Sequence, residues 1–276
     1  MKQPPFTPDE ILDGYDAVSQ LYPFIPSMCI WRAWEYAAYR RYQMTEPVLD
    51  IGCGDGHFFR LVWPAIREVI GVDMDSGVVE AARRSGVYRE IYHAPAHRLP
   101  ESAGTFGSAF ANCSLEHMDH LPQVLLRVRA SLRPGGTYLL SVVTDKFLEW
   151  DPIPLLAEVI ANDQGARTLK NDYVNYHHLV TPISAADWAK LLEDSGFEVV
   201  EHLPIVPEVT SRVFLFFDHL WHIRFSEREA GDRLFSYFNS IPRFPQGLRT
   251  VLAGILKMEV DWATGSGAIF WARIKP

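Results

Sequence analysis

Short apolar runs alternate along the chain with segments in which apolar residues recur every three or four positions. The apolar runs predict strands, and the longer periods predict helices between most of them. This alternation is typical of a mostly parallel sheet covered by helices on both faces, because parallel strands need crossover connections. The strands are expected near residues 47–51, 68–72, 89–93, 106–112, 136–143, 197–203 and 267–274.

Residues that start and stop helices support the same pattern. Asp75 or Ser76 is a candidate N-cap, and Gly86 ends the helix that follows. Ser184 begins another predicted helix, which Gly196 ends just before the next apolar run. A further helix with a buried face is predicted before the Pro134-Gly135-Gly136 stop, from the spacing of Leu121, Leu125, Val128 and Leu132.

Composition narrows the class of protein. The chain has 276 residues, 48% of them hydrophobic, which suffices for one full α/β core with additions. Its net charge of −8, with no basic run, argues against a nucleic-acid partner. Three cysteines without metal-ligand spacing indicate a reducing compartment, and we expect the cytoplasm. A signal-like apolar segment at the start and a membrane-spanning run are both missing from the sequence.

The run Val48-Leu49-Asp50-Ile51-Gly52-Cys53-Gly54-Asp55-Gly56 carries the strongest chemical signal. A dinucleotide fingerprint would need a third glycine where His57 stands, and no Lys-Ser/Thr pair follows to make a P-loop. Asp50 at the strand end would repel a polyphosphate, but it suits the cationic methionine portion of S-adenosylmethionine. Gly52 and Gly54 would let the backbone turn sharply and approach a ligand closely. The alternative is a glycine-rich turn that binds no ligand.

A second carboxylate follows at the distance that a nucleoside site needs. Asp73 ends the next apolar run, 21 residues after Gly52, and an acidic residue at about this separation accepts hydrogen bonds from a ribose diol in doubly wound sheets. Met74 beside it offers an apolar face for adenine. Asp75 is expected to be a helix cap, not a ligand.

Five motifs together resemble the class I S-adenosylmethionine-dependent methyltransferases, and most closely their small-molecule branch, such as the ubiquinone and menaquinone biosynthetic enzymes. They are Val48 to Gly56, Gly71 to Asp75, Ala96-His97-Arg98-Leu99-Pro100, Ser114-Leu115-Glu116-His117 and Leu132-Arg133-Pro134-Gly135-Gly136. The resemblance covers residues 45–145 well, and 184–203 and the last strand more loosely. It implies a Rossmann-like seven-stranded sheet with an antiparallel last strand and S-adenosyl-L-methionine as the cofactor.

The resemblance also implies cofactor contacts beyond the glycine turn. They involve Cys53, Ala96 and His97, and Asn112 and Cys113 at the end of the fourth strand. Family members often carry an acidic residue where this chain has Pro95, so adenine recognition would fall on the backbone near Ala96 and on His97. A solvated loop position is the alternative for His97.

Segments outside this core hold the information on the acceptor. We expect a helical cap over 1–46, a methyltransferase core over 47–206 and 266–276, a lid-like insertion over 144–182 and an aromatic-rich helical insertion over 207–265. The cap and the last insertion contain 19 of the 35 aromatic residues. Most of these aromatics would pack the added helices, and a minority would line a pocket for an apolar or aromatic metabolite. The insertion over 207–265 could instead form a homodimer surface. The candidate substrate contacts are Tyr15, Tyr22, Tyr173, Tyr176, His177 and His178.

Methyl transfer to oxygen benefits from a general base, and His117, just past the fourth strand, is the candidate. Its alternative role is a local hydrogen bond at a helix start, and Glu116 is expected to be structural or to face the cofactor. His219 and His222 share a helical face, but no third ligand stands at a fitting spacing, so no metal is expected. The other functions considered are a non-catalytic S-adenosylmethionine-binding or scaffolding protein and, less favoured because of Asp50 and His57, a nicotinamide oxidoreductase.

Overall fold

The computed structural model describes residues 5–225 and 228–275, and its contacts divide the chain into two compact units. Each unit is assembled from three separate segments, so the chain passes repeatedly from one to the other. The helical unit comprises Met1–Ala38, Asp145–Leu179 and Pro204–Gly267, and the sheet unit comprises Tyr39–Thr144, Val180–Leu203 and Ala268–Pro276.

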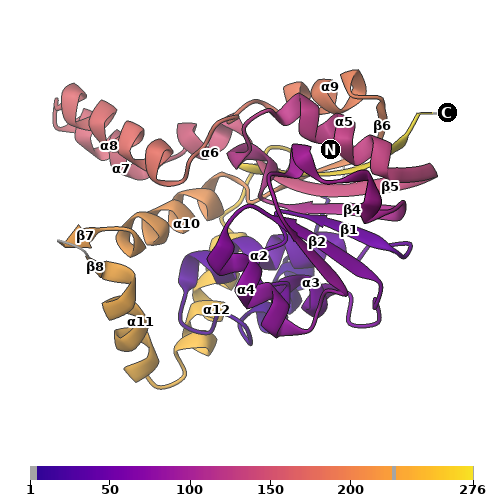
Figure 1. The fold of residues 1–276 in the computed structure, drawn as a ribbon. Helices are drawn as coiled ribbons and strands as arrows, with labels where there is room; N and C mark the ends of the chain where they lie inside the picture. Colours follow the sequence, from indigo (N-terminus) through magenta and orange to yellow (C-terminus); the bar gives the residue numbers. More distant parts are fainter. Residues whose placement is uncertain (1–4, 226–227, 276) are drawn as a thin grey trace. The chain divides into compact units, whose positions relative to one another are not determined.

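A seven-stranded sheet with the order β3-β2-β1-β4-β5-β9-β6 forms the sheet unit's centre (Figure 1). The five strands from β3 to β5 pair in parallel, whereas the last strand of the chain, β9, runs antiparallel. The predicted fold class is therefore confirmed. The strands are β1 (Val48–Ile51), β2 (Val69–Asp73), β3 (Glu90–His93), β4 (Phe106–Asn112), β5 (Leu132–Val143), β6 (Phe197–Ile205) and β9 (Gly267–Ile274).

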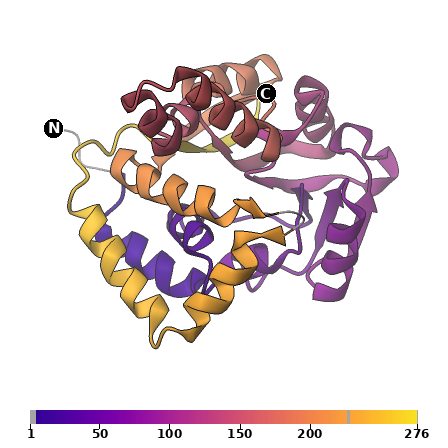
Figure 2. The same cartoon turned by 90° about the vertical axis from the view of Figure 1, so that its left-hand side faces the viewer.

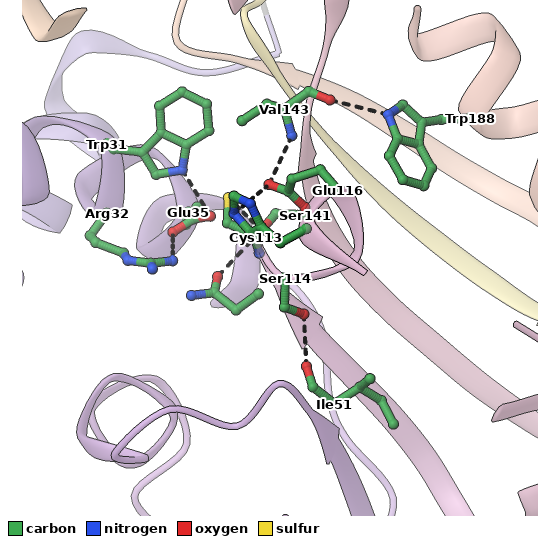
Figure 3. A network of polar contacts seen from close by, with 12 residues as sticks. Trp31, Arg32, Glu35, Ile51, Cys113, Ser114, Glu116, Ser141, Val143 and Trp188 are labelled. Atoms are coloured by element: carbon green, nitrogen blue, oxygen red, sulfur yellow. Dashed lines mark hydrogen bonds and ion pairs between the residues drawn. The ribbon is translucent and has the colours of Figure 1, made fainter. Parts of the chain in front are cut away.

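Helices cover both faces of this sheet, with α3 and α4 on one face and α5 and α9 on the other (Figure 1). Trp188 of α9 is fully buried, and its indole N–H donates to the Val143 carbonyl at the end of β5 over 3.1 Å (Figure 3). The central strands are buried along their whole length, because helices remove both faces from water. The helices are α3 (His57–Val62), α4 (Ser76–Ser85), α5 (Leu121–Ser131) and α9 (Ala185–Asp194).

The helix termini follow the predicted residues in two cases and differ in one. Asp75 caps α4 by accepting from the Val78 N–H, and Gly86 ends the helix in a left-handed conformation. Ser184 caps α9. Leu132, however, was expected as the last apolar position of α5, and that expectation was wrong. The helix ends at Ser131, and Leu132 begins β5 opposite Phe106 of β4, where it is still buried.

The helical unit is held together by aromatic packing. Phe6 meets Trp34 edge-on, and Trp31 contacts both Phe147 and Phe214. Inside α2, Glu35 is fully buried and accepts hydrogen bonds from Trp31 and Arg32 (Figure 3). Part of the aromatic residues of this unit therefore form a core, and others, such as Phe235 and Tyr237, are exposed.

Several helices of this unit contact one another directly. Helix α7 packs on α8, α12 packs on α1, and α10 contacts α7, α11 and α12 (Figure 2). The bounds are α1 (Pro8–Val18), α2 (Pro26–Tyr39), α6 (Asp145–Glu149), α7 (Pro152–Val159), α8 (Asp163–Tyr176), α10 (Glu208–Trp221), α11 (Ala230–Ser240) and α12 (Phe244–Leu256), with a short antiparallel pair of β7 (Arg224–Phe225) and β8 (Arg228–Glu229).

Candidate functional site

Three glycines at the end of β1 all adopt positive φ angles, which favour glycine: +66° at Gly52, +57° at Gly54 and +79° at Gly56. At Gly52 an added Cβ would lie 2.5 Å from the Cβ of Ser114, and at Gly56 it would strike the Tyr88 ring. At Gly54, by contrast, no neighbouring atom lies within 4 Å of that position. The first and third glycines thus permit close packing, whereas Gly54 faces open space that a ligand can enter.

Asp73 ends β2 and is joined to this glycine turn. Its Oδ2 accepts from the Gly54 N–H over 3.2 Å, and its Oδ1 accepts from the Asp75 N–H over 3.0 Å. Each carboxylate oxygen has two lone pairs, so acceptor capacity remains for ribose hydroxyls. Met74 is 69% exposed, and its carbonyl lies 3.1 Å from the His93 Nε2. The predicted ribose residue is therefore bonded directly to the turn, and the predicted adenine residue follows it with an exposed side chain.

Asp50 lies beneath the turn, where its side chain does not reach solvent. It is 2% exposed, and its Oδ2 is 2.7 Å from the Tyr88 hydroxyl, which is also 2.8 Å from the Cys53 carbonyl oxygen. Burial raises the pKa of Asp50 to about 8, against the hydrogen bond from Tyr88, and Asp73 raises it further. A protonated Asp50 can donate to Tyr88, which then donates to Cys53.

This arrangement changes the role expected of two predicted cofactor residues. A direct contact between Asp50 and the charged end of a ligand finds no support in this geometry, since the carboxyl group is enclosed under the turn. Cys53 is also buried, and burial raises the pKa of its thiol. Tyr88, which holds both, was missed in the sequence because it stands between two elements and belongs to no recognisable motif.

The end of β4 supplies the next side of the site. Asn112 Oδ1 accepts from the Tyr39 hydroxyl over 2.8 Å. Cys113 has a φ of +44°, and its N–H donates to the Ser141 carbonyl and hydroxyl oxygens over 3.1 and 2.9 Å (Figure 3). The Ser114 hydroxyl donates to the Ile51 carbonyl over 2.8 Å (Figure 3). These bonds fix the backbone after β4 beside the end of β1.

Glu116 and His117 follow directly. Glu116 is fully buried; its Oε1 accepts from the Val143 N–H over 3.3 Å (Figure 3), and its carbonyl oxygen accepts from the N–H groups of Val180 and Thr181. These bonds give Glu116 a structural role. The His117 side chain is 36% exposed, with its Nε2 4.0 Å from Glu116 Oε1. The candidate base is thus accessible and stands next to a buried carboxyl group.

Ala96 and His97 lie in a short 3-10 turn, Ala96–Arg98, after β3. The His97 ring is half-buried and contacts the His120 ring edge-on, with 5.0 Å between centroids. This contact supports a defined orientation for His97 in preference to a solvated loop position. Two cavities of the sheet unit lie elsewhere; the larger, about 640 Å³, is lined by Arg129, Leu132 and Arg273 at the opposite edge, where β5 begins.

All six predicted substrate contacts belong to the helical unit. Tyr15 is 1% exposed and donates to the Pro245 carbonyl over 2.8 Å, which explains it as a packing residue. Tyr22 is half-buried, and its carbonyl accepts from the Cys29 thiol. His178 is exposed at a φ of +47°.

The other three predicted contacts, Tyr173, Tyr176 and His177, gather in one polar cluster around Asp218 of α10. The Tyr173 hydroxyl donates to Asp218 Oδ2 over 2.6 Å, and His177 Nε2 lies 3.2 Å from the same oxygen. Asp218 carries no motif in the sequence, so only the fold reveals this cluster.

An open glycine turn joined to a strand-end carboxylate, at the carboxyl edge of a mostly parallel sheet, defines a Rossmann-like nucleoside-cofactor protein. Residues 32–202, more than half of the chain, match the family model described as a methyltransferase domain. The chain belongs to this family. The match confirms the predicted class, whose cofactor is S-adenosylmethionine.

Similar proteins agree with this assignment. The chain is 27% identical to a demethylmenaquinone methyltransferase of Symbiobacterium thermophilum over 48% of its own length and 55% of the relative's. It is 30% identical to a ubiquinone biosynthesis O-methyltransferase of Bordetella avium over 57% and 66% of the two lengths. The matches thus span about half to two thirds of these curated relatives.

A solved structure, an S-adenosylmethionine-dependent methyltransferase of Thermotoga maritima, shares the fold with a TM-score of 0.55 at 16% identity, covering 95% of this chain and 96% of that one. Across the residues that the structure describes, no helix is long and apolar enough to cross a membrane.

Proposed function

We propose that this protein transfers the methyl group of S-adenosylmethionine to an oxygen nucleophile on a small aromatic or apolar molecule. The observation that carries the proposal is the turn at Gly54, which has open space on one side and is joined through its N–H to the Asp73 carboxylate. A side chain at Gly54 would fill the space that a nucleoside needs. The hydrogen bond to a strand-end carboxylate sets Gly54 apart from Gly86, which is equally open but only ends a helix.

The residues present fit the cofactor. Asp73 would accept from the ribose hydroxyls, exposed Met74 would cover one face of adenine, and the backbone at Gly54 would approach the ligand closely. The bound cofactor supplies a methyl group activated by the sulfonium charge. Positioning and exclusion of water account for much of the rate of such a transfer, so the rigid turn is itself part of the chemistry.

His117 would take the proton from the acceptor hydroxyl. Its side chain is partly exposed, and its Nε2 lies 4.0 Å from the buried Glu116, which accepts from the Val143 N–H. A histidine has an ordinary pKa suited to proton transfer near neutral pH. Glu116 would act through His117 by favouring one ring orientation and stabilising the imidazolium that forms.

The evidence for the chemical class of the methyl acceptor comes mainly from the similar proteins of known name. The Bordetella avium protein is named for O-methylation in ubiquinone biosynthesis, which favours a phenolic or similar aromatic hydroxyl group. The aromatic residues of the helical unit give weaker support, because buried rings such as Trp31 and Phe147 pack against each other, which accounts for them without a ligand.

Calorimetry with S-adenosylhomocysteine tests the cofactor site. The wild-type protein should bind it, and Asp73→Ala should weaken binding at least tenfold. Asp55→Ala is the matched control: it removes another carboxylate of the same turn, one that caps the His57 N–H instead of bonding Gly54. Equal affinity in wild type and Asp73→Ala would remove the nucleoside site from this place.

Label transfer from methyl-labelled S-adenosylmethionine to a panel of catechols and other phenols tests the reaction. His117→Ala should lower kcat about 10²- to 10⁴-fold without changing cofactor affinity, as expected for loss of a general base. His57→Ala, another histidine of the sheet unit, serves as the control. Binding without transfer to any acceptor would favour the second candidate, a non-catalytic S-adenosylmethionine-binding protein.

A further inference from the structure

Three potential metal ligands converge in the helical unit, far from each other in sequence. His177 follows α8, and Asp218 and His222 lie at the end of α10 and just beyond it. One ligand atom from each lies within 4.8 Å of the other two. His177 Nε2 is 3.2 Å from Asp218 Oδ2, and His222 Nε2 is 3.7 Å from Asp218 Oδ1.

The two imidazole–carboxylate distances are close to those around a bound metal ion. Ligands about 2.0–2.2 Å from a tetrahedral ion are separated by about 3.3 Å. The two imidazole nitrogens face the same carboxylate at close to this spacing. His177 Nε2 is enclosed, yet it has no partner in hydrogen-bond geometry among the described residues, although Asp218 lies within reach. A cation between these atoms would satisfy nitrogen and carboxylate together.

The surroundings also favour a cation. His177 and His222 are the C-cap residues of α8 and α10, so the negative ends of two helix dipoles point to this place. The imidazole side chains are each 21% exposed, so the cluster lies close to the surface of the helical unit, while Asp218 is buried. The positive neighbour Arg224 is engaged by Glu229.

Groups behind the three residues hold them in orientation, as outer partners of metal ligands do. His222 Nδ1 lies 3.5 Å from Glu229 Oε2, and Glu229 in turn accepts from the Tyr176 hydroxyl over 2.8 Å. Tyr173 donates to Asp218. The Glu229 carboxylate thus lies near the far nitrogen of His222, where a proton on Nδ1 would leave Nε2 to bind a metal.

We propose that His177, Asp218 and His222 form a binding site for a divalent transition-metal ion of the zinc type. Two imidazoles and one carboxylate are the donors that zinc accepts, and three protein ligands leave a fourth position for water or another ligand. The ion would join the ends of α8 and α10. This proposal differs from the expectation of no metal, which rested on His219 and His222 as a pair without a third ligand. In the structure, His219 Nε2 lies 2.7 Å from Asp151 Oδ2 and is not part of the site. The ligands that join His222 are Asp218 and the distant His177.

Zinc content measures the site directly. Protein freed of any histidine tag is loaded with Zn²⁺, passed through gel filtration and analysed for metal. The wild type should retain about one zinc ion per chain, whereas His177→Ala and His222→Ala should each retain less than a tenth of that. His178→Asn is the matched control: it removes the adjacent exposed histidine, and asparagine tolerates its positive φ.

A second measurement distinguishes variants that lose a metal ligand from variants that fail to fold. Zn²⁺ should raise the Tm of the wild type and of His178→Asn, but not that of His177→Ala, whose circular dichroism should remain native. Glu229→Gln keeps all three ligands and should weaken zinc affinity about 10- to 100-fold. Co²⁺ should give the visible absorption of a four-coordinate site in the wild type and in His178→Asn, but not in His177→Ala. Zinc retained by both alanine variants, or no zinc in the wild type, would overturn the proposal and leave a hydrogen-bonded imidazole–carboxylate cluster.

Discussion

Asp50 shows how burial decides the state of a single side chain. One hydroxyl proton on Tyr88 cannot fully serve both the Asp50 carboxylate and the Cys53 carbonyl, whereas a protonated Asp50 completes a donor chain through Tyr88 to Cys53. This agrees with the pKa of about 8, raised by burial. Asparagine at this position can donate to Tyr88 in the same way.

The raised pKa predicts a pH dependence of stability. Between the ordinary aspartate pKa and about pH 8 the folded state keeps a proton that the unfolded chain has lost, so the free energy of unfolding falls as pH rises. The contribution is at most about 1.4 kcal/mol per pH unit. Asp50→Asn should remove this slope while staying folded. Urea titrations of both proteins from pH 5 to 8 would show converging wild-type and variant stabilities at low pH; parallel curves would refute the assignment.

Gly54 and Gly86 form a matched pair that separates backbone strain from ligand exclusion. Both have φ near +60°, and neither has an atom within 4 Å of an added Cβ. Alanine at either position should therefore cost about 1–2 kcal/mol of stability through the left-handed conformation. Only Gly54→Ala should weaken S-adenosylhomocysteine binding, by tenfold or more, in calorimetry. Equal affinities in the two variants would show that the open space at Gly54 is not the ligand's.

At the scale of elements, two helix caps of similar strength have different consequences. Asp75 caps α4 two residues after Asp73, the proposed ribose ligand, whereas Thr7 and Glu10 form a capping box on α1 in the helical unit. Asp75→Ala and Thr7→Ala should each lower the free energy of unfolding by about 1 kcal/mol. Asp75→Ala should also weaken S-adenosylhomocysteine binding several-fold, because it loosens the turn after β2. A cofactor affinity lowered equally by Thr7→Ala would contradict this.

Elements whose signals are local could be predicted from the sequence. The seven strands of the sheet, the Asp75 and Ser184 caps and the glycine turn follow from apolar runs, cap residues and spacing within about 20 positions. Leu132 was assigned to the wrong element because a buried leucine satisfies a helical period and a strand equally well. Leu132 belongs to the strand because β5 pairs with β4, and this pairing joins residues too far apart in the sequence for a local pattern to show it.

Contacts between side chains that are distant in the sequence could not be predicted from local patterns. Tyr88 reaches Asp50 from 38 positions away, and His177 meets Asp218 across 41 positions. Neither contact leaves a periodic or spaced signal in one sequence. The environment of buried Asp50 and the histidine–carboxylate cluster could therefore be found only in the structure, and the cofactor contacts of the glycine turn stay a prediction.

For the whole molecule, the division into two units predicts that two ligands leave separate footprints. The proposed cofactor residues, in the glycine turn, at Asp73 and at the end of β4, lie in the sheet unit, and the proposed metal ligands lie in the helical unit. In hydrogen exchange, S-adenosylhomocysteine should protect residues 50–56, 73–75 and 112–118, whereas Zn²⁺ should protect 173–178 and 215–222. Ligand binding slows exchange by stabilising the state that binds it, so each footprint reports its own site.

Variants of one site provide the control for the other in this experiment. Gly54→Ala should abolish the cofactor footprint and leave the zinc footprint, and His177→Ala should do the reverse. The chain crosses between the two units several times, so the segments of one unit are joined to segments of the other. A variant that unfolded the protein would therefore lose both footprints together. Loss of the cofactor footprint in folded His177→Ala would instead mean that the helical cluster takes part in cofactor binding, and the metal site would then belong to the methyl-transfer machinery.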